Sequence, residues 1–267
     1  MMWAWRPDSE QVQAVSLYTE TRGSGPELVM IHGWGLHSGI WDKFAPLLEA
    51  SFRVTRVDLP GHGRSDWRGA TSLDEWVAAV LTVVPAPAVW LGWSLGGLLA
   101  SRAAMTAPEK VAALLTLASS PCFVRKPGWQ SAMLPSLLEN FSAELAKDFE
   151  RTLTRFLSLQ VRGSEHTGAV LKTLRTTLLA QGPPDTAALA AGLEMLRATD
   201  LRPDMQAIDC PMLVIMGERD TLVPLNAGRE TLGLCRDARL EVINGAGHAP
   251  FLAAPQAVAD RINRFLL

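Results

Sequence analysis

The sequence predicts an α/β fold, in which a mostly parallel central sheet is flanked by helices and carries a helical cap insertion. Short apolar runs recur along the chain with helix-like stretches between them. Strands that are buried on both faces of a sheet have this near-continuous apolar character, which indicates parallel strands covered by helices. The run of strands stops between Pro121 and Pro211, where the sequence becomes helical. A chain of 267 residues has room for one such domain with an insertion.

Six apolar runs are predicted to form the central sheet. They are residues 28–31, 54–57, 88–91, 112–118, 212–216 and 240–243. Residues 10–18 alternate in polarity, as a half-buried strand does. We therefore expect this segment to form an antiparallel edge hairpin with the next strand along the chain.

The gap between the strands predicts the cap. Helical patterns cover residues 134–141, 143–159, 166–179 and 186–198. We assign residues 122–202 to the cap, and residues 1–121 and 203–267 to the α/β core. One apolar stripe with helical spacing consists of Leu145, Phe149, Leu153, Phe156 and Leu157. The stripe packs within the cap or on the core, unless it faces outward, in which case Phe156 would cover a hydrophobic substrate channel.

Composition excludes several classes of function. A net charge of -2 gives no basic surface for nucleic acid. No run of eighteen apolar residues predicts a membrane span, and the first residues lack the pattern of a secretory signal. Cys122, Cys210 and Cys235 are odd in number and widely spaced, which argues against a disulfide framework or a metal site. We expect three buried thiols in a cytoplasmic protein that binds no metal.

The motif Gly92-Trp93-Ser94-Leu95-Gly96 lies between an apolar run and a helix-like run. A strand, G-x-S-x-G and a helix in this order form a nucleophile elbow, a turn so sharp that the serine hydroxyl projects clear of the sheet. The two glycines are needed because a side chain there would strike a neighbouring strand or helix. The sequence therefore predicts Ser94 as a nucleophile.

A serine nucleophile needs a base and a carboxylate that orients the base. In hydrolases with this elbow the three follow the chain order serine, acid, histidine, and only His166 and His248 come after Ser94. His248 lies in a small-residue loop after residues 240–243, whereas His166 lies in a polar run typical of a solvated loop. We predict that His248 is the base.

The acid is expected just after the strand at residues 212–216. Asp220 is the best placed, and Glu218 is the alternative. Asp220 is also consistent with a simple turn aspartate, since aspartate is common in turns.

The negative charge that develops in acyl transfer needs two N–H donors. One is expected from the backbone of Leu95, the residue after the nucleophile, and the second from the loop after residues 28–31, where Trp34 offers its N–H between two glycines. Trp34 also suits a hydrophobic wall, and the two roles are compatible. His32, in the same loop, is interpreted as a hydrogen-bonded structural residue.

The predicted cap is locally basic. Its cationic residues include Arg151, Arg155, Arg162, Lys172 and Arg175. Such charges usually form a solvated helix face, and the alternative is a docking surface for an acidic carrier.

Five motifs together resemble the α/β-hydrolase superfamily: residues 32–35, residues 58–65, the elbow, the Asp220 turn and the His248 loop. More narrowly, the chain is similar to the pimeloyl-[acyl-carrier protein] methyl ester esterases of biotin synthesis. The segments that carry this likeness are residues 32–36, 90–97, 118–123, 155–160, 192–196 and 200–202.

The resemblance implies an α/β-hydrolase fold and a serine esterase that removes a methyl ester from pimeloyl groups on acyl-carrier protein. It implies Ser94, Asp220 and His248 as the triad, Trp34 and Leu95 as oxyanion donors, and Trp34, Leu95 and Phe156 as substrate contacts. Arg151 and Arg155 would contact the carrier. A further basic position of the family is Gly168 here, so Lys172, with Arg162 or Arg175, would have to compensate. No cofactor is implied, and we expect a monomer.

Three other functions are compatible with the same residues. A generalist short-chain carboxylesterase would share the triad and differ in the cap. A serine acyltransferase or a carbon–carbon bond hydrolase would share the core. A non-catalytic binding protein is disfavoured by the complete set of serine, aspartate and histidine.

Overall fold

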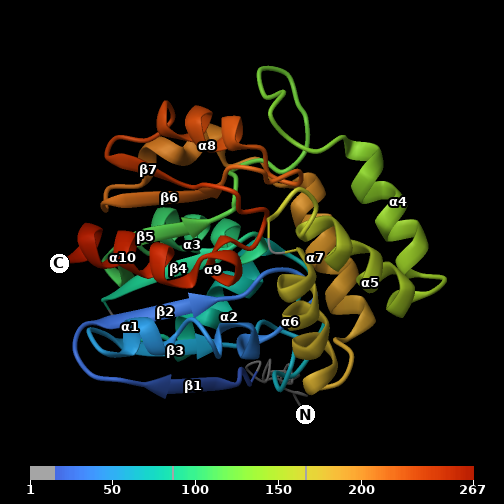
Figure 1. Cartoon of the computed structure of the whole chain (residues 1–267), viewed down its shortest axis with the longest axis horizontal. Helices are drawn as coiled ribbons and strands as arrows, with labels where there is room; N and C mark the ends of the chain where they lie inside the picture. Colours follow the sequence, from blue (N-terminus) through green and yellow to red (C-terminus); the bar gives the residue numbers. More distant parts are fainter. Residues whose placement is uncertain (1–15, 86, 166) are drawn as a thin grey trace, which may run out of the picture.

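In the described part of the chain, the fold is built around one seven-stranded sheet (Figure 1). The computed structural model describes residues 16–85, 87–165 and 167–267. The strands lie in the order β1-β3-β2-β4-β5-β6-β7, and every neighbouring pair is parallel except β1 with β3. Their bounds are β1 Thr19–Arg22, β2 Glu27–Ile31, β3 Arg53–Val57, β4 Ala88–Trp93, β5 Val111–Leu117, β6 Met212–Gly217 and β7 Ala238–Ile243. The predicted α/β fold with a mostly parallel sheet is confirmed, and each of the six predicted runs forms a strand.

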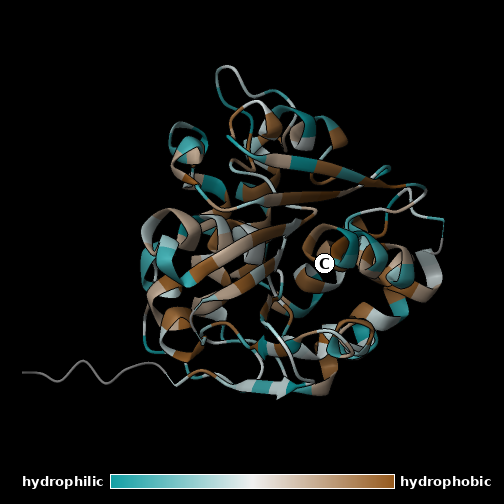
Figure 2. Cartoon of the chain, turned by 90° about the vertical axis from the view of Figure 1, so that its left-hand side faces the viewer, coloured by the Kyte–Doolittle hydropathy of each residue, from teal (hydrophilic) through white to brown (hydrophobic). Residues whose placement is uncertain are grey.

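Helices cover both faces of the sheet because side chains alternate along each strand. On β2, Val29 and Ile31 belong to one apolar cluster, and Leu28 and Met30 belong to the other. The first cluster includes residues of α2 (Leu73–Val83), α3 (Leu95–Thr106) and α8 (Leu225–Leu232). The second includes residues of α1 (Pro46–Glu49), α9 (Pro250–Ala253) and α10 (Pro255–Leu266). The inner strands are accordingly coloured mainly as hydrophobic in Figure 2.

The predicted antiparallel pairing of the edge segment with the next strand, residues 28–31, is wrong. Residues 10–15 lie outside the described residues, and residues 16–18 are not in a strand. The antiparallel edge strand is β1, and it pairs with β3. The next strand, β2, already has β3 on one side and β4 on the other, so only the free edge of β3 is open to β1.

Four helices between β5 and β6 form the cap region, which is drawn in yellow-green to orange at the right of Figure 1. They are α4 Pro135–Leu145, α5 Phe149–Gln160, α6 Thr167–Ala180 and α7 Thr186–Ala198. The single helix predicted over residues 143–159 is wrong, because the Asp148 side chain accepts a hydrogen bond from the Arg151 N–H and starts a new helix there. The exact division at residues 122 and 202 stays a prediction.

The apolar stripe of the cap faces inward. Leu145, Leu153, Phe156 and Leu157 are buried, and Phe149 is half-buried. The stripe therefore joins the cap to the core and does not form an exposed patch. In the described part of the chain, no helix combines the length and the apolar character that crossing a membrane requires.

The three cysteines are free thiols. Cys122 is buried as expected, whereas Cys210 and Cys235 are only partly buried. Burial raises the pKa of all three thiols, and that of Cys235 rises to about 11. They therefore stay protonated and unreactive at neutral pH.

Candidate active site

Ser94 occupies the sharp turn between β4 and α3. Its φ is 54° and its ψ is -116°, a conformation that side chains rarely adopt. The turn is held from both sides, since the Ser94 N–H donates to the Leu117 carbonyl at 2.9 Å and the Ser119 hydroxyl donates to the Ser94 carbonyl at 2.7 Å. Backbone strain at a residue held this firmly is typical of a functional site.

The two glycines of the elbow are required by close backbone packing, as the sequence indicates. A Cβ atom on Gly92 would collide with the Gly96 carbonyl, and one on Gly96 would collide with the Ile31 carbonyl. Any larger residue would therefore push α3 away from the sheet and displace Ser94.

Ser94, His248 and Asp220 form an unbroken chain of hydrogen bonds. His248 Nδ1–H donates to Asp220 Oδ2 at 2.7 Å, which leaves Nε2 as the acceptor for the Ser94 hydroxyl at 2.9 Å. All three residues are buried. A serine in this arrangement can lose its proton to the imidazole as it attacks a carbonyl carbon.

The position of Asp220 is fixed by its own loop. Its second oxygen, Oδ1, accepts hydrogen bonds from the N–H groups of Leu222 at 2.8 Å and Val223 at 3.0 Å. The alternative acid, Glu218, is half-exposed and accepts from the Gly245 N–H instead, so it does not contact the imidazole. The alternative base, His166, lies outside the described residues.

Trp34 and Leu95 lie against the same residue of the cap. A Cβ atom on Gly192 of α7 would stand 2.7 Å from Trp34 Cδ1 and 3.3 Å from Leu95 Cδ2. The Trp34 indole N–H donates to the Leu189 carbonyl of the same helix at 2.8 Å. Among the residues that the structure describes, the backbone N–H groups of Trp34 and Leu95 have no hydrogen-bond acceptor. Both N–H groups remain available to a developing oxyanion, and the Trp34 ring forms an apolar surface against α7.

Replacing Gly192 with alanine is expected to lower kcat for a p-nitrophenyl ester by about tenfold or more, since displacing an oxyanion donor costs up to about 10²–10³. The added methyl group would move the Trp34 indole, and with it the backbone of residues 32–35, which is called the oxyanion loop below after its predicted role. Alanine favours a helix over glycine, so the variant should keep its fold. Steady-state kinetics together with thermal unfolding checks this, and unchanged kcat in a folded variant would contradict it.

His32 has the structural role that the sequence indicates. Its Nδ1 bonds the Gly33 carbonyl at 2.8 Å, and its Nε2 accepts from the Leu59 N–H at 2.9 Å. Complete burial, helped by the neighbouring His62, lowers the pKa of His32 to about 3. The ring is therefore neutral at any physiological pH and pins the oxyanion loop to the end of β3.

Phe156, on α5 of the cap, packs against Trp34. The two rings meet edge to face at 4.8 Å between centroids, and the Phe141 ring also meets Phe156 edge to face, at 5.5 Å. An apolar pocket of about 180 Å³ opens nearby between α5 and α6. One of its lining residues, Leu153, also touches Gly35 of the oxyanion loop.

The basic residues of the cap are exposed. Arg151, Arg162 and Lys172 extend from α5, from the turn after it and from α6. Arg155 bonds Glu144 at 2.6 Å, and both side chains of this pair keep about half of their surface in solvent. These positions are accessible to a partner.

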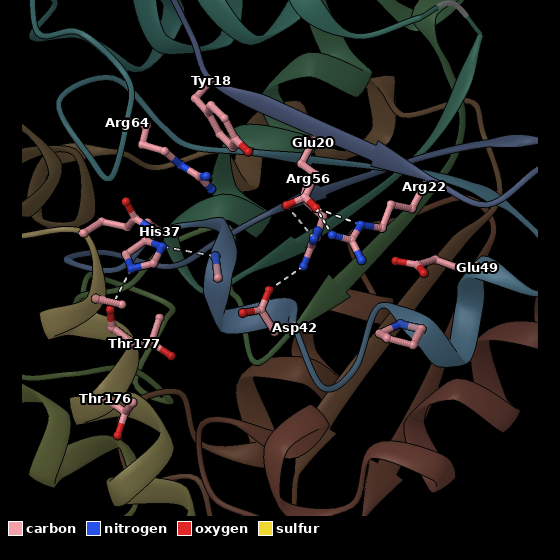
Figure 3. Close-up of a pocket in the computed structure, with 14 residues that line it drawn as sticks. Tyr18, Glu20, Arg22, His37, Asp42, Glu49, Arg56, Arg64, Thr176 and Thr177 are labelled. Atoms are coloured by element: carbon pink, nitrogen blue, oxygen red, sulfur yellow. Dashed lines mark hydrogen bonds and ion pairs between the residues drawn. The ribbon is translucent and has the colours of Figure 1, made fainter.

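A larger pocket lies elsewhere, with a volume of about 600 Å³ between the β1 edge and α6 (Figure 3). It contains no triad residue. Its buried Arg56 bonds both Glu20 and Asp42, and the His37 imidazole bonds the Thr177 carbonyl of α6 at 2.6 Å. Because Arg56 pairs with Glu20 and Asp42 of the core and His37 bonds α6, the pocket is a polar contact region between the core and the cap.

Two backbone contacts of His248 have no signal in the residue types around it. Its N–H donates to the Gln160 carbonyl at 3.0 Å, and its carbonyl accepts from the Trp93 indole at 2.7 Å. Any residue supplies a backbone carbonyl, so sequence reasoning missed Gln160 as a support. The resemblance of residues 155–160 to known cap sequences was the signal that could have pointed to Gln160.

Comparison with known proteins places this geometry among hydrolases. Residues 28–261 match the model of the alpha/beta hydrolase family. A pimeloyl-[acyl-carrier protein] methyl ester esterase of Nitrosomonas europaea is 44% identical over 241 residues, which cover 90% of this chain and 96% of that protein. The protein of the same name from Methylococcus capsulatus is 42% identical over 94% of this chain and 99% of its own length. Among solved structures, an esterase from Exiguobacterium antarcticum has a TM-score of 0.87 at 22% identity, covering 95% of this chain and 96% of that one.

Proposed function

The chain belongs to the alpha/beta hydrolase family and, within it, to the pimeloyl-[acyl-carrier protein] methyl ester esterases, and from this premise we propose how it acts. It hydrolyses the methyl ester of a pimeloyl group carried on acyl-carrier protein, releasing methanol and a free carboxylate in biotin synthesis. The strongest support for this function is the hydrogen-bonded chain of Ser94, His248 and Asp220 in a protein whose sequence, cap included, is similar to the esterases of this family. We also propose that the protein is a monomer and that it works in the cytoplasm.

The first half of the reaction acylates Ser94. His248 Nε2 takes the hydroxyl proton while Ser94 Oγ attacks the ester carbonyl, and Asp220 stabilises the imidazolium that forms. The N–H groups of Trp34 and Leu95 bind the oxyanion of the tetrahedral intermediate. When the intermediate collapses, His248 returns the proton to the methoxide oxygen and methanol leaves.

The second half restores the enzyme. Water replaces methanol, His248 takes one of its protons, and the resulting hydroxide attacks the acyl-serine carbonyl. The second tetrahedral intermediate collapses with Ser94 as the leaving group, which recovers its proton from His248. The free pimeloyl carboxylate remains attached to its carrier.

The acyl chain is proposed to lie under the cap, between Trp34, Leu95 and Phe156. None of these three residues lines the pocket between α5 and α6, but Leu153 of that pocket lies against Gly35, one residue after Trp34, which supports an apolar approach from that side. An apolar chain that enters there would pass Leu153 and meet the oxyanion loop at Gly35. Burial of methylene groups stabilises such binding by about 0.8 kcal/mol each.

The carrier is proposed to dock on the exposed basic residues Arg151, Arg155, Arg162 and Lys172. Replacing Arg151 and Arg155 together with glutamine is expected to raise KM for the carrier-bound ester by about tenfold, because surface charge steers the encounter of the partners. The values of kcat and of p-nitrophenyl ester hydrolysis should stay unchanged. Arg197→Gln, which removes an exposed cation from α7, is the matched control.

The same assay separates the alternative functions. An unchanged KM for the carrier-bound substrate in the double variant would contradict the docking surface. Faster hydrolysis of a short p-nitrophenyl ester than of the carrier-bound ester would favour a generalist carboxylesterase. A product that forms only with an added alcohol or thiol acceptor would favour an acyltransferase.

A further inference from the structure

The backbone of His248 is held between the core and the cap. Its carbonyl accepts the Trp93 indole N–H from the core, and its N–H donates to the carbonyl of Gln160, the last residue of α5. The segment that begins with Gln160 and follows α5, residues 160–165, is called the cap turn below. The position of the cap turn therefore bears directly on the residue proposed as the base.

The cap turn contacts both loops that carry the histidine and the acid. The Glu165 N–H donates to the Gly245 carbonyl at 3.0 Å, three residues before His248. The Glu165 carboxylate pairs with Arg219 at 3.0 Å, one residue before Asp220. Glu165 thus holds the His248 loop with its backbone and the Asp220 loop with its side chain.

Close packing leaves little freedom at this junction. A Cβ atom on Gly245 would stand 2.6 Å from the Glu165 carboxyl carbon, and one on Gly163 would stand 3.2 Å from the Arg219 carbonyl. A Cβ atom on Gly247 would stand 3.1 Å from the Gln160 carbonyl. Gly163 and Gly247 therefore let the cap turn and the two loops approach backbone to backbone, and Gly245 leaves room for the Glu165 carboxylate.

We propose that the cap turn positions the active site, with Glu165 and Arg219 as positioning residues that fix the His248 and Asp220 loops relative to Ser94. The inference rests on the proposed function, because it takes His248 as the base. A displacement of about 1 Å at a reacting group lowers the rate by about 10²-fold, so a small shift of these loops changes kcat. Neither residue is among the proposed substrate contacts, so we expect KM to stay close to the wild-type value.

The test uses Glu165→Gln, Arg219→Gln and the double variant in the full chain. Glu194→Gln is the matched control, because it breaks a similarly exposed ion pair on α7. The readouts are kcat and KM for p-nitrophenyl butyrate, the rate at which a fluorophosphonate modifies Ser94, and the midpoint of thermal unfolding. An exposed ion pair contributes little to stability, so the fold should be unaffected.

Each single variant is expected to lose about threefold to tenfold in kcat and in fluorophosphonate reactivity, with KM within twofold and an unchanged unfolding midpoint. The double variant should be no slower than Arg219→Gln, because that substitution breaks both the pair with Glu165 and the longer contact with Glu218 at 3.9 Å, so that Glu165→Gln removes nothing further. Unchanged kcat in Glu165→Gln, additive losses, or an equal loss in Glu194→Gln would overturn the proposal.

Wild type and Ser94→Ala are measured in parallel to separate this proposal from the proposed function. If the wild type neither hydrolyses the ester nor reacts with the fluorophosphonate, the proposed function fails and the positioning role fails with it. If the wild type is active, Ser94→Ala is inactive and Glu165→Gln matches the wild type, only the positioning role is overturned.

Discussion

Replacing Ser94 with alanine is expected to lower kcat for ester hydrolysis by about 10⁴-fold or more, since removal of a serine nucleophile from comparable triads has costs of this size. The hydroxyl is the group that bonds His248 Nε2, and no other hydroxyl is hydrogen-bonded to that nitrogen in the described part of the chain. The residual rate would come from the oxyanion donors and from binding alone. Hydrolysis of p-nitrophenyl butyrate by the purified variant measures this loss.

The matched control for this variant is Ser101→Ala. Ser101 is a buried serine in α3, the helix that begins directly after Ser94. Its hydroxyl bonds only the Gly97 carbonyl one turn away. It should keep wild-type kcat, and both variants should unfold close to the wild-type temperature. A Ser94→Ala protein with more than about one hundredth of the wild-type rate would contradict the nucleophile assignment, because triad losses are far larger.

Replacing Asp220 with asparagine is expected to lower kcat by about 10⁴-fold, as loss of the charge leaves the histidine in the wrong tautomer. The carboxylate accepts the proton of His248 Nδ1–H, and an amide at the same place would offer an N–H to that nitrogen. Glu218→Gln removes the alternative acid, whose carboxylate contacts the Gly245 N–H and not the imidazole.

The comparison of these two variants decides which acid serves the histidine. We expect Asp220→Asn to be at least about 100-fold slower than Glu218→Gln, because only the former breaks the triad. Measuring kcat for both with p-nitrophenyl butyrate, and checking each by circular dichroism, gives the answer. Equal losses in the two variants would contradict the assignment of Asp220.

Features fixed by local chemistry were predictable from the sequence. The apolar runs that became β2, β4 and β6 are strands buried on both faces, and burial leaves its mark on almost every residue of such a run. The elbow was predictable because its glycines are imposed by backbone collisions at Gly92 and Gly96. The hydrogen bonds of His248 and Asp220 follow from the order of residues after Ser94 and the ends of two adjacent strands.

Features fixed by distant contacts were not predictable. The helix break before α5 is an exception, because Asp148 is a local capping signal that the continuous helical pattern around it concealed. The pairing of β1 with β3 depends on which sheet edge is free, which local pattern does not reveal. The bonds from Gln160 and Glu165 to the histidine loop use backbone groups that every residue has, so residue identity carries no signal for them.

The most direct test of the account is to incubate the purified protein with pimeloyl methyl ester attached to acyl-carrier protein, beside an equal concentration of p-nitrophenyl butyrate. Mass spectrometry of the carrier follows the loss of the methyl group. We expect the wild type to remove the methyl group with a higher kcat/KM than it has for the small ester. Ser94→Ala should remove none. Turnover of p-nitrophenyl butyrate with the carrier-bound methyl ester left intact would contradict it.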